Sequence, residues 1–270
     1  IGEMSYGQSA RSVKHVCEQN GYDVRTYEMF QYIFPQHKRR GLMSKIAGWL
    51  NLLYNMIRLN IFFPFAKITA YQPDVIFIFK GTHIFSSTVQ KLRKEFPKAK
   101  LINYNLDHPF VDYNTSMSYI RSIKYYDIHL TCKKYVLRTM ESAWAKKVSY
   151  ITCWYDEKLM PTDVVVTEED KKKYACDVLF IGTRDNKRDK LLWDLAEKFD
   201  VKIYGNNRDR SVNSAVKKAR QWVTIYGTEY VKAVRVAKIN FNTLRLQDKY
   251  SSNLKNMEIP WCGGVLLTEW

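Results

Sequence analysis

The chain has 270 residues, of which 46% are hydrophobic and 14% aromatic, with only 11 Gly and 7 Pro; this composition excludes a disordered or linker-rich protein. Forty-three Lys and Arg against 27 Asp and Glu give a formal net charge of +16, which favours an anionic partner. The basic residues are spread along the chain without an aromatic-rich platform for single strands, so we do not expect nucleic acid.

The five cysteines are widely spaced and include no Cys-x-x-Cys pair, so we expect free thiols in a reducing compartment. Neither they nor the five His have zinc-ligand spacing, and we expect no metal and no cofactor. The chain opens without the basic start and apolar core of a signal peptide, which predicts a cytoplasmic protein. Because it lacks an initial Met and stops just after a strand-like run, we expect both ends of a longer protein to be missing.

Residues 42–69 form the first long apolar segment along the chain. Lys45, Arg58 and Pro64 interrupt it, together with three Asn, so no unbroken run of about 20 residues could span a membrane. Two interpretations remain open. The segment is either a pair of helices packed on the first sheet or an interfacial helix that rests on an anionic membrane, at its inner face.

Eight short apolar runs predict the strands of parallel sheets covered on both faces. They lie at residues 75–79, 100–104, 127–131, 148–152, 178–181, 201–204, 238–242 and 264–268. Helical patterns fall between most of them, including residues 85–96 and 187–199. This βαβ order predicts an α/β protein with doubly wound, Rossmann-like sheets.

The βαβ order runs twice, with a break at residues 154–162 and at the charged stretch 168–173. We therefore predict an N-terminal acceptor domain at residues 1–160 and a C-terminal donor domain, truncated at its end, at residues 161–270. Two such domains are expected to face one another across a cleft in which ligands bind.

Loops after the predicted strands carry the first candidate site residues. Asp107 and His108 could position or deprotonate an acceptor hydroxyl, although Asp107 could instead cap its own loop. Gly182 would let the backbone approach a phosphate. The basic residues that follow could face a diphosphate or form an ordinary exposed helix start; they are Arg184, Lys187 and Arg188.

Residues 251–268 are the most informative stretch. We predict a helix capped by Ser251 or Ser252, a break at residues 260–263 and then a buried strand. Backbone amides at that helix start, around Ser252 and Asn253 and with Lys255 one turn in, would bind a diphosphate. Glu258, about two turns in, could then accept hydrogen bonds from a ribose diol.

The run Glu258-Ile-Pro-Trp-Cys-Gly263 before a strand resembles the Glu-Ala-Met-Ala-x-Gly signature of group 1 glycosyl transferases. It is still more similar to the Arg-x-Phe-Glu-Ile-Pro-Ala-Cys-Gly-Gly form of the CgeB-like branch. The resemblance implies a GT-B fold and a donor-ribose role for Glu258. The loop at Gly182 is similar to the family's phosphate loop, and Tyr204-Gly205 to the loop beside the base.

Two further stretches, Pro73-Asp74 and Asn105 to Pro109, resemble motifs of the CgeB-like branch, and Tyr155-Asp156 resembles its interdomain Tyr-Asp. The sequence also departs from the family. Tyr250 stands where many retaining members have a second Glu, and Lys255 stands at the branch's Arg. The resemblance therefore assigns neither donor sugar nor stereochemistry.

The expected function is transfer of a sugar from a nucleotide-diphosphate donor to a hydroxyl of a glycan, polymer or lipid-linked acceptor, as in cell-surface polysaccharide synthesis. Basic groups can stabilise the leaving diphosphate, and the chain has no Asp-x-Asp pair, so we expect metal-independent transfer. Two alternatives stay open: a nucleotide-sugar epimerase of the same fold, and a non-catalytic glycan-binding protein with a degenerate cleft.

Overall fold

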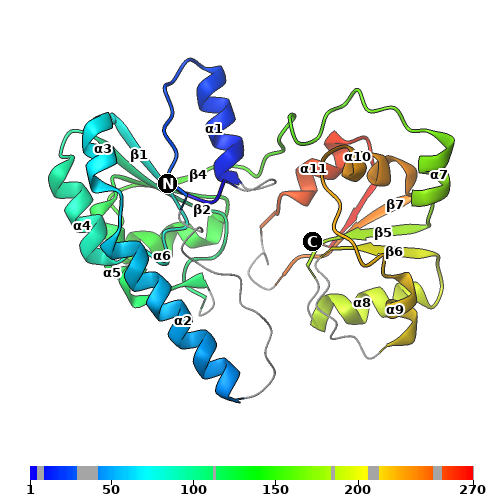
Figure 1. Cartoon of the computed structure of the whole chain (residues 1–270). Helices are drawn as coiled ribbons and strands as arrows, with labels where there is room; N and C mark the ends of the chain where they lie inside the picture. Colours follow the sequence, from blue (N-terminus) through cyan, green and yellow to red (C-terminus); the bar gives the residue numbers. More distant parts are fainter. Residues whose placement is uncertain are drawn as a thin grey trace. The chain divides into compact units, whose positions relative to one another are not determined.

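A computed structural model describes residues 1–4, 9–28, 42–111, 114–183, 186–205, 213–245 and 251–269. The chain divides into two compact units, Ile1–Ile151 and Thr152–Trp270. Each unit has its own four-stranded sheet (Figure 1). The division falls before the predicted position near residue 160, because Leu159 and Met160 pack into the core of the second unit.

All strand pairs of the described residues are parallel, which confirms the prediction of two Rossmann-like α/β sheets. The first sheet has the order β1-β2-β3-β4, with β1 Val75–Phe79, β2 Lys100–Asn105, β3 Ile128–Thr131 and β4 Val148–Tyr150. The second has the order β6-β5-β7-β8, with β5 Val178–Ile181, β6 Val201–Tyr204, β7 Ile239–Asn242 and β8 Leu266–Thr268.

The α-helices of the first unit are α1 Ser9–Gln19, α2 Leu42–Ile61, α3 Phe65–Tyr71, α4 Ser86–Glu95, α5 Met117–Ser122 and α6 Leu137–Ser142. Those of the second are α7 Glu168–Tyr174, α8 Asn186–Ala196, α9 Ser214–Ala219, α10 Gly227–Val236 and α11 Lys255–Trp261. No helix in the described ranges is long and apolar enough to cross a membrane.

Residues 1–2 extend the first sheet beyond β1. The backbone N–H of Phe79 donates to Ile1 O at 2.9 Å, and Gly2 forms a parallel bridge with Glu28 on its other side. The strand order therefore reverses between residues 1–2 and β1. Open parallel sheets bind ligands at such a switch point, beyond the carboxyl ends of the strands.

Residues 42–69 form α2 and α3, which contact the first unit through a few apolar side chains. Leu59 of α2, Phe63 between the two helices and Ile68 of α3 join the cluster that includes Ile78 of β1 and Leu92 of α4. These side chains exclude water from one face of the sheet, which holds α2 and α3 in place.

Helices cover both faces of the second sheet. On one face Leu179 packs with Val231 of α10 and Ile259 of α11. On the other face Val178 and Phe180 pack with Leu192 and Val216, from α8 and α9. Alternate side chains of β5 therefore enter two different cores, which explains why β5 is a continuous apolar run. The strand β8 differs from the prediction of a buried strand, because Leu267 is half exposed.

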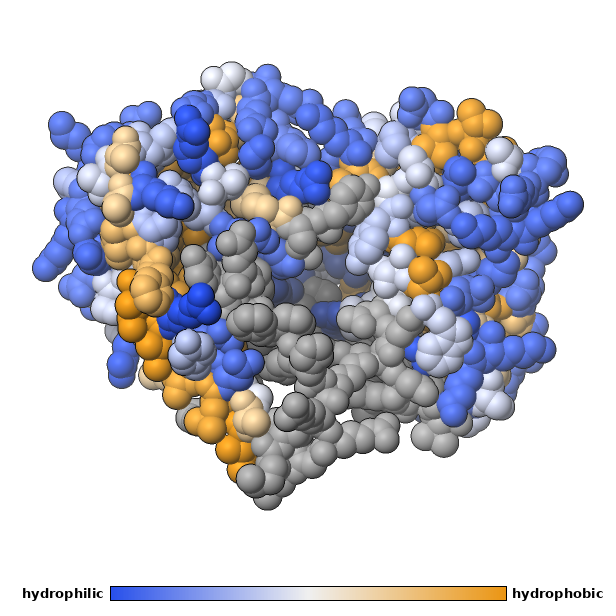
Figure 2. All heavy atoms as spheres, viewed as in Figure 1, coloured by the Kyte–Doolittle hydropathy of each residue, from blue (hydrophilic) through white to orange (hydrophobic). Residues whose placement is uncertain are grey.

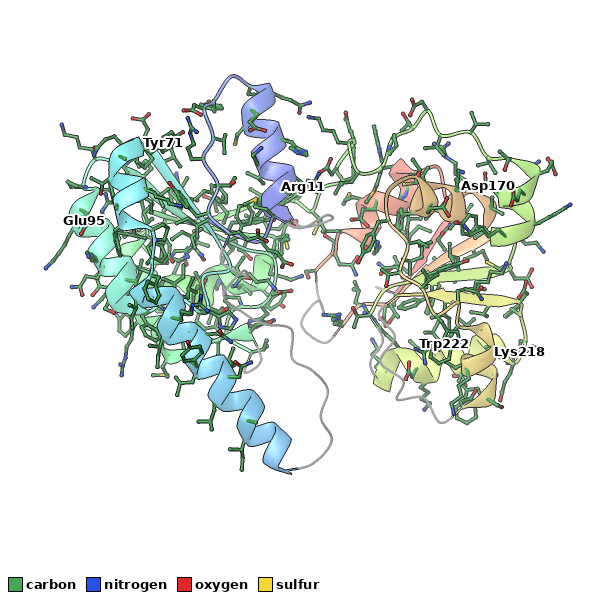
Figure 3. The ribbon with its side chains drawn as sticks, viewed as in Figure 1. Arg11, Tyr71, Glu95, Asp170, Lys218 and Trp222 are labelled. Carbon is green, nitrogen blue, oxygen red and sulfur yellow. The ribbon has the colours of Figure 1, made fainter. Side chains whose placement is uncertain are left out.

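The charged stretch at residues 168–173, where the βαβ order was predicted to be interrupted, is helical. It forms α7, on which Figure 3 labels Asp170. The start of α7 is a capping box: Thr167 Oγ1 accepts from Asp170 N, and Asp170 Oδ2 accepts from Thr167 N. Three acidic residues lie in its first turn and three Lys in its last, as the helix dipole favours. Charge order, and not apolar periodicity, specifies this helix.

Candidate functional site

The carboxyl edge of the second sheet has its switch point between β5 and β7. Arg188 of α8 joins the two loops that leave these strands. Its Nη1 donates to Thr183 O at 2.7 Å and its Nη2 to Thr243 O at 2.5 Å, and the residue is buried. Arg188 therefore fixes the walls of the switch point, which is a different task from the diphosphate contact that the sequence suggests. Arg184 lies outside the described residues.

Lys187 lies in the same place but pairs with an acid that sequence analysis missed. Its Nζ is 2.8 Å from Glu269 Oε2, just after β8. Glu269 also accepts from Thr243 Oγ1 and Leu244 N. Burial alone would raise the pKa of Glu269, but these bonds lower it below the ordinary value. A ligand phosphate would have to compete with Glu269 for Lys187.

Gly182 and Gly205 bring the loops after β5 and β6 into close contact. Gly205 has φ +142°, and a Cβ there would lie 2.2 Å from Gly182 O, so only glycine fits. The side chain of Tyr204 differs from the prediction that places it beside a base. It is buried near Tyr174, and burial raises its pKa to about 12. Only the backbone of Tyr204 reaches the sheet edge.

The helix start predicted at Ser251 or Ser252 is wrong, because α11 begins at Lys255 and Leu254 is its N-cap. The side-chain amide of Asn253 instead exchanges hydrogen bonds with Asn242 at the end of β7, at 3.1 and 3.2 Å. Asn242 Nδ2 also donates to Asn256 Oδ1 at 2.6 Å. These contacts hold residues 253–256 against the sheet edge, so the helix starts later in the sequence than predicted.

The later start changes what α11 offers to a ligand. Ser252 contributes its carbonyl, which accepts a weak bond from Cys153 Sγ at 3.5 Å. Pro260 lies inside the helix and not in a break after it. The helix α11 has seven residues, which is too short a helix to make a diphosphate site from its amides alone. Glu258 lies one turn from its start.

Glu258 is buried, and its carboxylate has two partners. Oε2 accepts from Lys255 Nζ at 2.7 Å and, weakly, from Tyr230 OH at 3.5 Å. The Lys255 ammonium lies 4.1 Å from the centre of the Tyr230 ring. Burial and the charge of Glu258 raise the pKa of Tyr230 well above its ordinary value. In the part of the chain described, no hydrogen bond reaches Oε1, so this oxygen can accept from a ligand.

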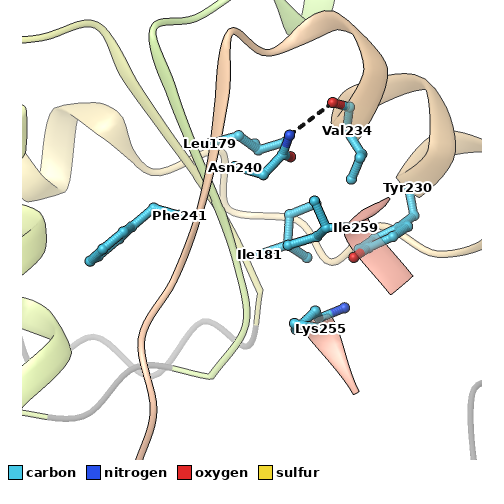
Figure 4. A pocket seen from close by; sticks show the side chains of 8 residues that line it. All are labelled: Leu179, Ile181, Tyr230, Val234, Asn240, Phe241, Lys255 and Ile259. Atoms are coloured by element: carbon cyan, nitrogen blue, oxygen red, sulfur yellow. Dashed lines mark hydrogen bonds between the residues drawn. The ribbon is translucent and has the colours of Figure 1, made fainter. Parts of the chain in front are cut away.

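A pocket opens beside this cluster, between the sheet and helices α10 and α11 (Figure 4). Its lining residues are Leu179, Ile181, Tyr230, Val234, Asn240, Phe241, Lys255 and Ile259. Its cavity volume is about 10 Å³, roughly the space of one water molecule and far below the roughly 300 to 1,000 Å³ usual for small-molecule sites. The pocket is therefore a shallow recess beside Glu258 and not a ready-made nucleotide-sugar site.

In the first unit, Asp107 and His108 follow β2 and have separate partners. Asp107 Oδ2 lies 2.7 Å from Lys80 Nζ, at the end of β1. Phe110 N donates to His108 Nδ1 at 3.2 Å, so the neutral ring carries its proton on Nε2. Burial and the nearby charge of Lys133 lower the pKa of His108. His108 can thus donate a hydrogen bond from Nε2, while the carboxylate of Asp107 is held by Lys80.

Within the described ranges, no three His, Cys, Asp or Glu side chains are grouped so that they could hold a metal ion. The five cysteines are free thiols; four of them are buried, whereas Cys17 is partly exposed.

Residues 187–270 match a family model described as "Glycosyl transferase-like". The match spans α8 to β8 and includes Lys187, Arg188, Lys255 and Glu258. No curated protein matches the chain. Among solved structures, the chain is similar to a putative UDP-N-acetylglucosamine 2-epimerase from Listeria monocytogenes. The identity is 12%, the TM-score 0.45, and the alignment covers 96% of this chain and 68% of the other.

Proposed function

We propose that this protein is a glycosyltransferase that moves a sugar from a nucleotide-diphosphate donor to a hydroxyl acceptor, with the donor bound by the second unit. One observation carries the proposal. Glu258 holds a buried carboxylate beside Lys255 and Tyr230, inside the segment that matches a glycosyl transferase-like family. We also propose that the protein belongs to the CgeB-like branch of the group 1 glycosyl transferases.

In this account the donor ribose binds Glu258. Lys255 neutralises part of the carboxylate charge at Oε2 and fixes its orientation, while Oε1 accepts from the ribose hydroxyls. A carboxylate held by packing and by a cation needs little reorganisation on binding, which favours affinity.

During transfer, the bond between the anomeric carbon and the diphosphate oxygen breaks, and its electron pair leaves with the diphosphate. The acceptor oxygen bonds to the anomeric carbon and loses its proton. We assign the uptake of this proton to Asp107. We assign to His108 a hydrogen bond donated from its Nε2 to the acceptor oxygen. Cationic side chains of the second unit, Lys187 among them, balance the diphosphate charge without a metal. The acceptor is a glycan, polymer or lipid-linked sugar.

The first test is thermal shift of the chain against UDP, GDP, CMP and ADP compounds. A nucleotide at about 100 times its dissociation constant stabilises a protein by about 2.7 kcal/mol, which a melting curve resolves readily. We expect one base to shift the melting temperature and the others not to. If no compound shifts it, the donor site is absent and a glycan-binding protein without catalysis becomes the better explanation.

A further inference from the structure

Helix α2 exposes a continuous apolar face, which an ordinary surface helix would bury. Its large exposed side chains are apolar and recur every three or four residues, which places them on one face. This α2 apolar stripe consists of Ile46, Leu50, Leu53, Tyr54, Ile57 and Ile61, each between 38% and 69% exposed. Figure 2 shows hydrophobic side chains gathered along this helix.

Where α2 meets the first unit, its inner face carries polar contacts beside the buried Leu59. Asn55 is buried, and Asn60 Oδ1 accepts from Phe85 N at 2.6 Å and from Thr88 Oγ1 at 2.7 Å. Asn60 Nδ2 donates to His83 O at 3.0 Å. Turning the stripe inward would break these bonds and leave buried polar groups unpaired. The fold therefore holds the stripe toward the outside.

The charge of the first unit indicates what covers the stripe. Residues 1–151 contain 22 Lys and Arg against 10 Asp and Glu, a formal excess of +12 out of the total +16. No acidic residue occurs between Glu28 and Asp74, a segment that includes all of α2. A second copy of the unit would carry the same charge and be repelled, whereas an anionic surface would be attracted.

We propose that the α2 apolar stripe docks on the surface of an anionic lipid bilayer, with the helix lying in the plane of the headgroups. A helix of 20 residues is about 30 Å long, and its stripe buries apolar side chains at the acyl boundary while nearby cations face acidic headgroups. This inference stands on α2 and the charge of its unit alone, so it does not depend on the proposed glycosyl transfer.

Docking would place one end of the first sheet near the bilayer. The bonds of Asn60 join α2 to the loop that follows β1, and Lys80, at the start of that loop, pairs with Asp107. The carboxyl edge of the first sheet therefore lies at the end of α2 where the stripe finishes.

The experiment is flotation of the 270-residue chain with vesicles of phosphatidylcholine, alone or with 30% phosphatidylglycerol. We expect binding to the acidic vesicles, weakened by salt because exposed charges are screened beyond about 8 Å at physiological ionic strength. The double variant L50E/I57E should bind at least about tenfold more weakly, since each Glu would bring a charge to the acyl boundary.

The matched control is V165E/V223E, which changes the net charge equally at two exposed apolar positions of the second unit. It should keep near wild-type flotation. If L50E/I57E proves unstable, the uncharged variant L53Q/I61Q is expected to give the same loss. Flotation that is absent, equal on neutral vesicles or unaffected by the stripe variants overturns the proposal. So does a dimer, seen by sedimentation without flotation, that L50E/I57E converts to monomer.

Discussion

Replacing Glu258 with Gln tests the donor site most sharply at a single residue. Gln keeps the shape of the side chain but loses the charge and one acceptor. Hydrogen bonds to charged groups contribute roughly 1.5 to 3 kcal/mol, so losing this assistance should weaken nucleoside diphosphate binding about ten- to a hundredfold. Calorimetric titration with the nucleotide selected by the thermal-shift panel measures the change.

The ion pair with Lys255 adds a second effect. The Lys255 and Glu258 side chains are 29% and 11% exposed, and Glu258→Gln removes their 2.7 Å contact. We therefore expect the unliganded variant to lose about 1 kcal/mol of stability, because Lys255 can still reach water. A change of melting temperature alone then cannot separate a binding role from a packing role.

Comparing ribose with 2′-deoxyribose nucleotides separates the two roles. If the carboxylate accepts from the ribose diol, the wild-type chain should bind the ribo form about tenfold or more tightly. The Glu258→Gln variant should bind the two forms with affinities within roughly threefold of each other, because the carboxylate that accepts from the hydroxyl is gone. Tyr230→Phe, which removes only the 3.5 Å contact, is the control and should keep the preference. Equal weakening of both nucleotides by Glu258→Gln would refute the ribose contact.

Three further predictions concern metal, backbone and pH. Nucleotide binding and transfer should persist in excess EDTA; complete loss that Mg²⁺ or Mn²⁺ restores would contradict metal independence. Gly205→Ala should lower the free energy of unfolding, measured in urea, by at least about 2 kcal/mol, because its Cβ would lie 2.2 Å from Gly182 O. The control Gly21→Ala, with φ +81° and nothing within 4 Å, should lower it by about half as much. Equal losses would show that the close approach to Gly182 O is not the cause. Burial lowers the pKa of His129 in the folded protein to about 4, whereas its value in the unfolded chain is near 6.5. Between these two values the unfolded state binds a proton that the folded state does not. Stability should therefore fall as the pH drops from about 6.5 toward 4, by up to about 1.4 kcal/mol per pH unit. Urea titrations at pH 7 and pH 5 should show a smaller difference for His129→Gln than for wild type, and an identical difference would contradict the assignment.

The sheets could be predicted from the sequence because each strand is a short apolar run with a turn beside it. Val75–Phe79 and Val178–Ile181 form strands with the predicted bounds. The helix α7 was missed because its residues are charged throughout and it packs through few side chains, such as Tyr174. Its specification lies in a capping box and in charge order, which an apolar pattern does not contain.

The candidate site was only partly predictable, because its key contacts join distant parts of the chain. Ser251 and Ser252 have the local pattern of a helix cap, but the bonds of Asn253 to Asn242 delay the helix to Lys255. The pairing of Lys187 with Glu269 spans 82 residues, and no local spacing predicts it. Tertiary hydrogen bonds here override local propensity.

The central claim is that this chain transfers sugar, and the most direct measurement uses donors labelled in the sugar and carrying the selected nucleotide. Each is incubated with the chain and a pool of glycan, polymer and lipid-linked acceptors. The account predicts that label moves into an acceptor and that nucleoside diphosphate is released in equal amount. Label that stays on the nucleotide as an epimerised sugar, with no diphosphate released, would contradict it and indicate an epimerase.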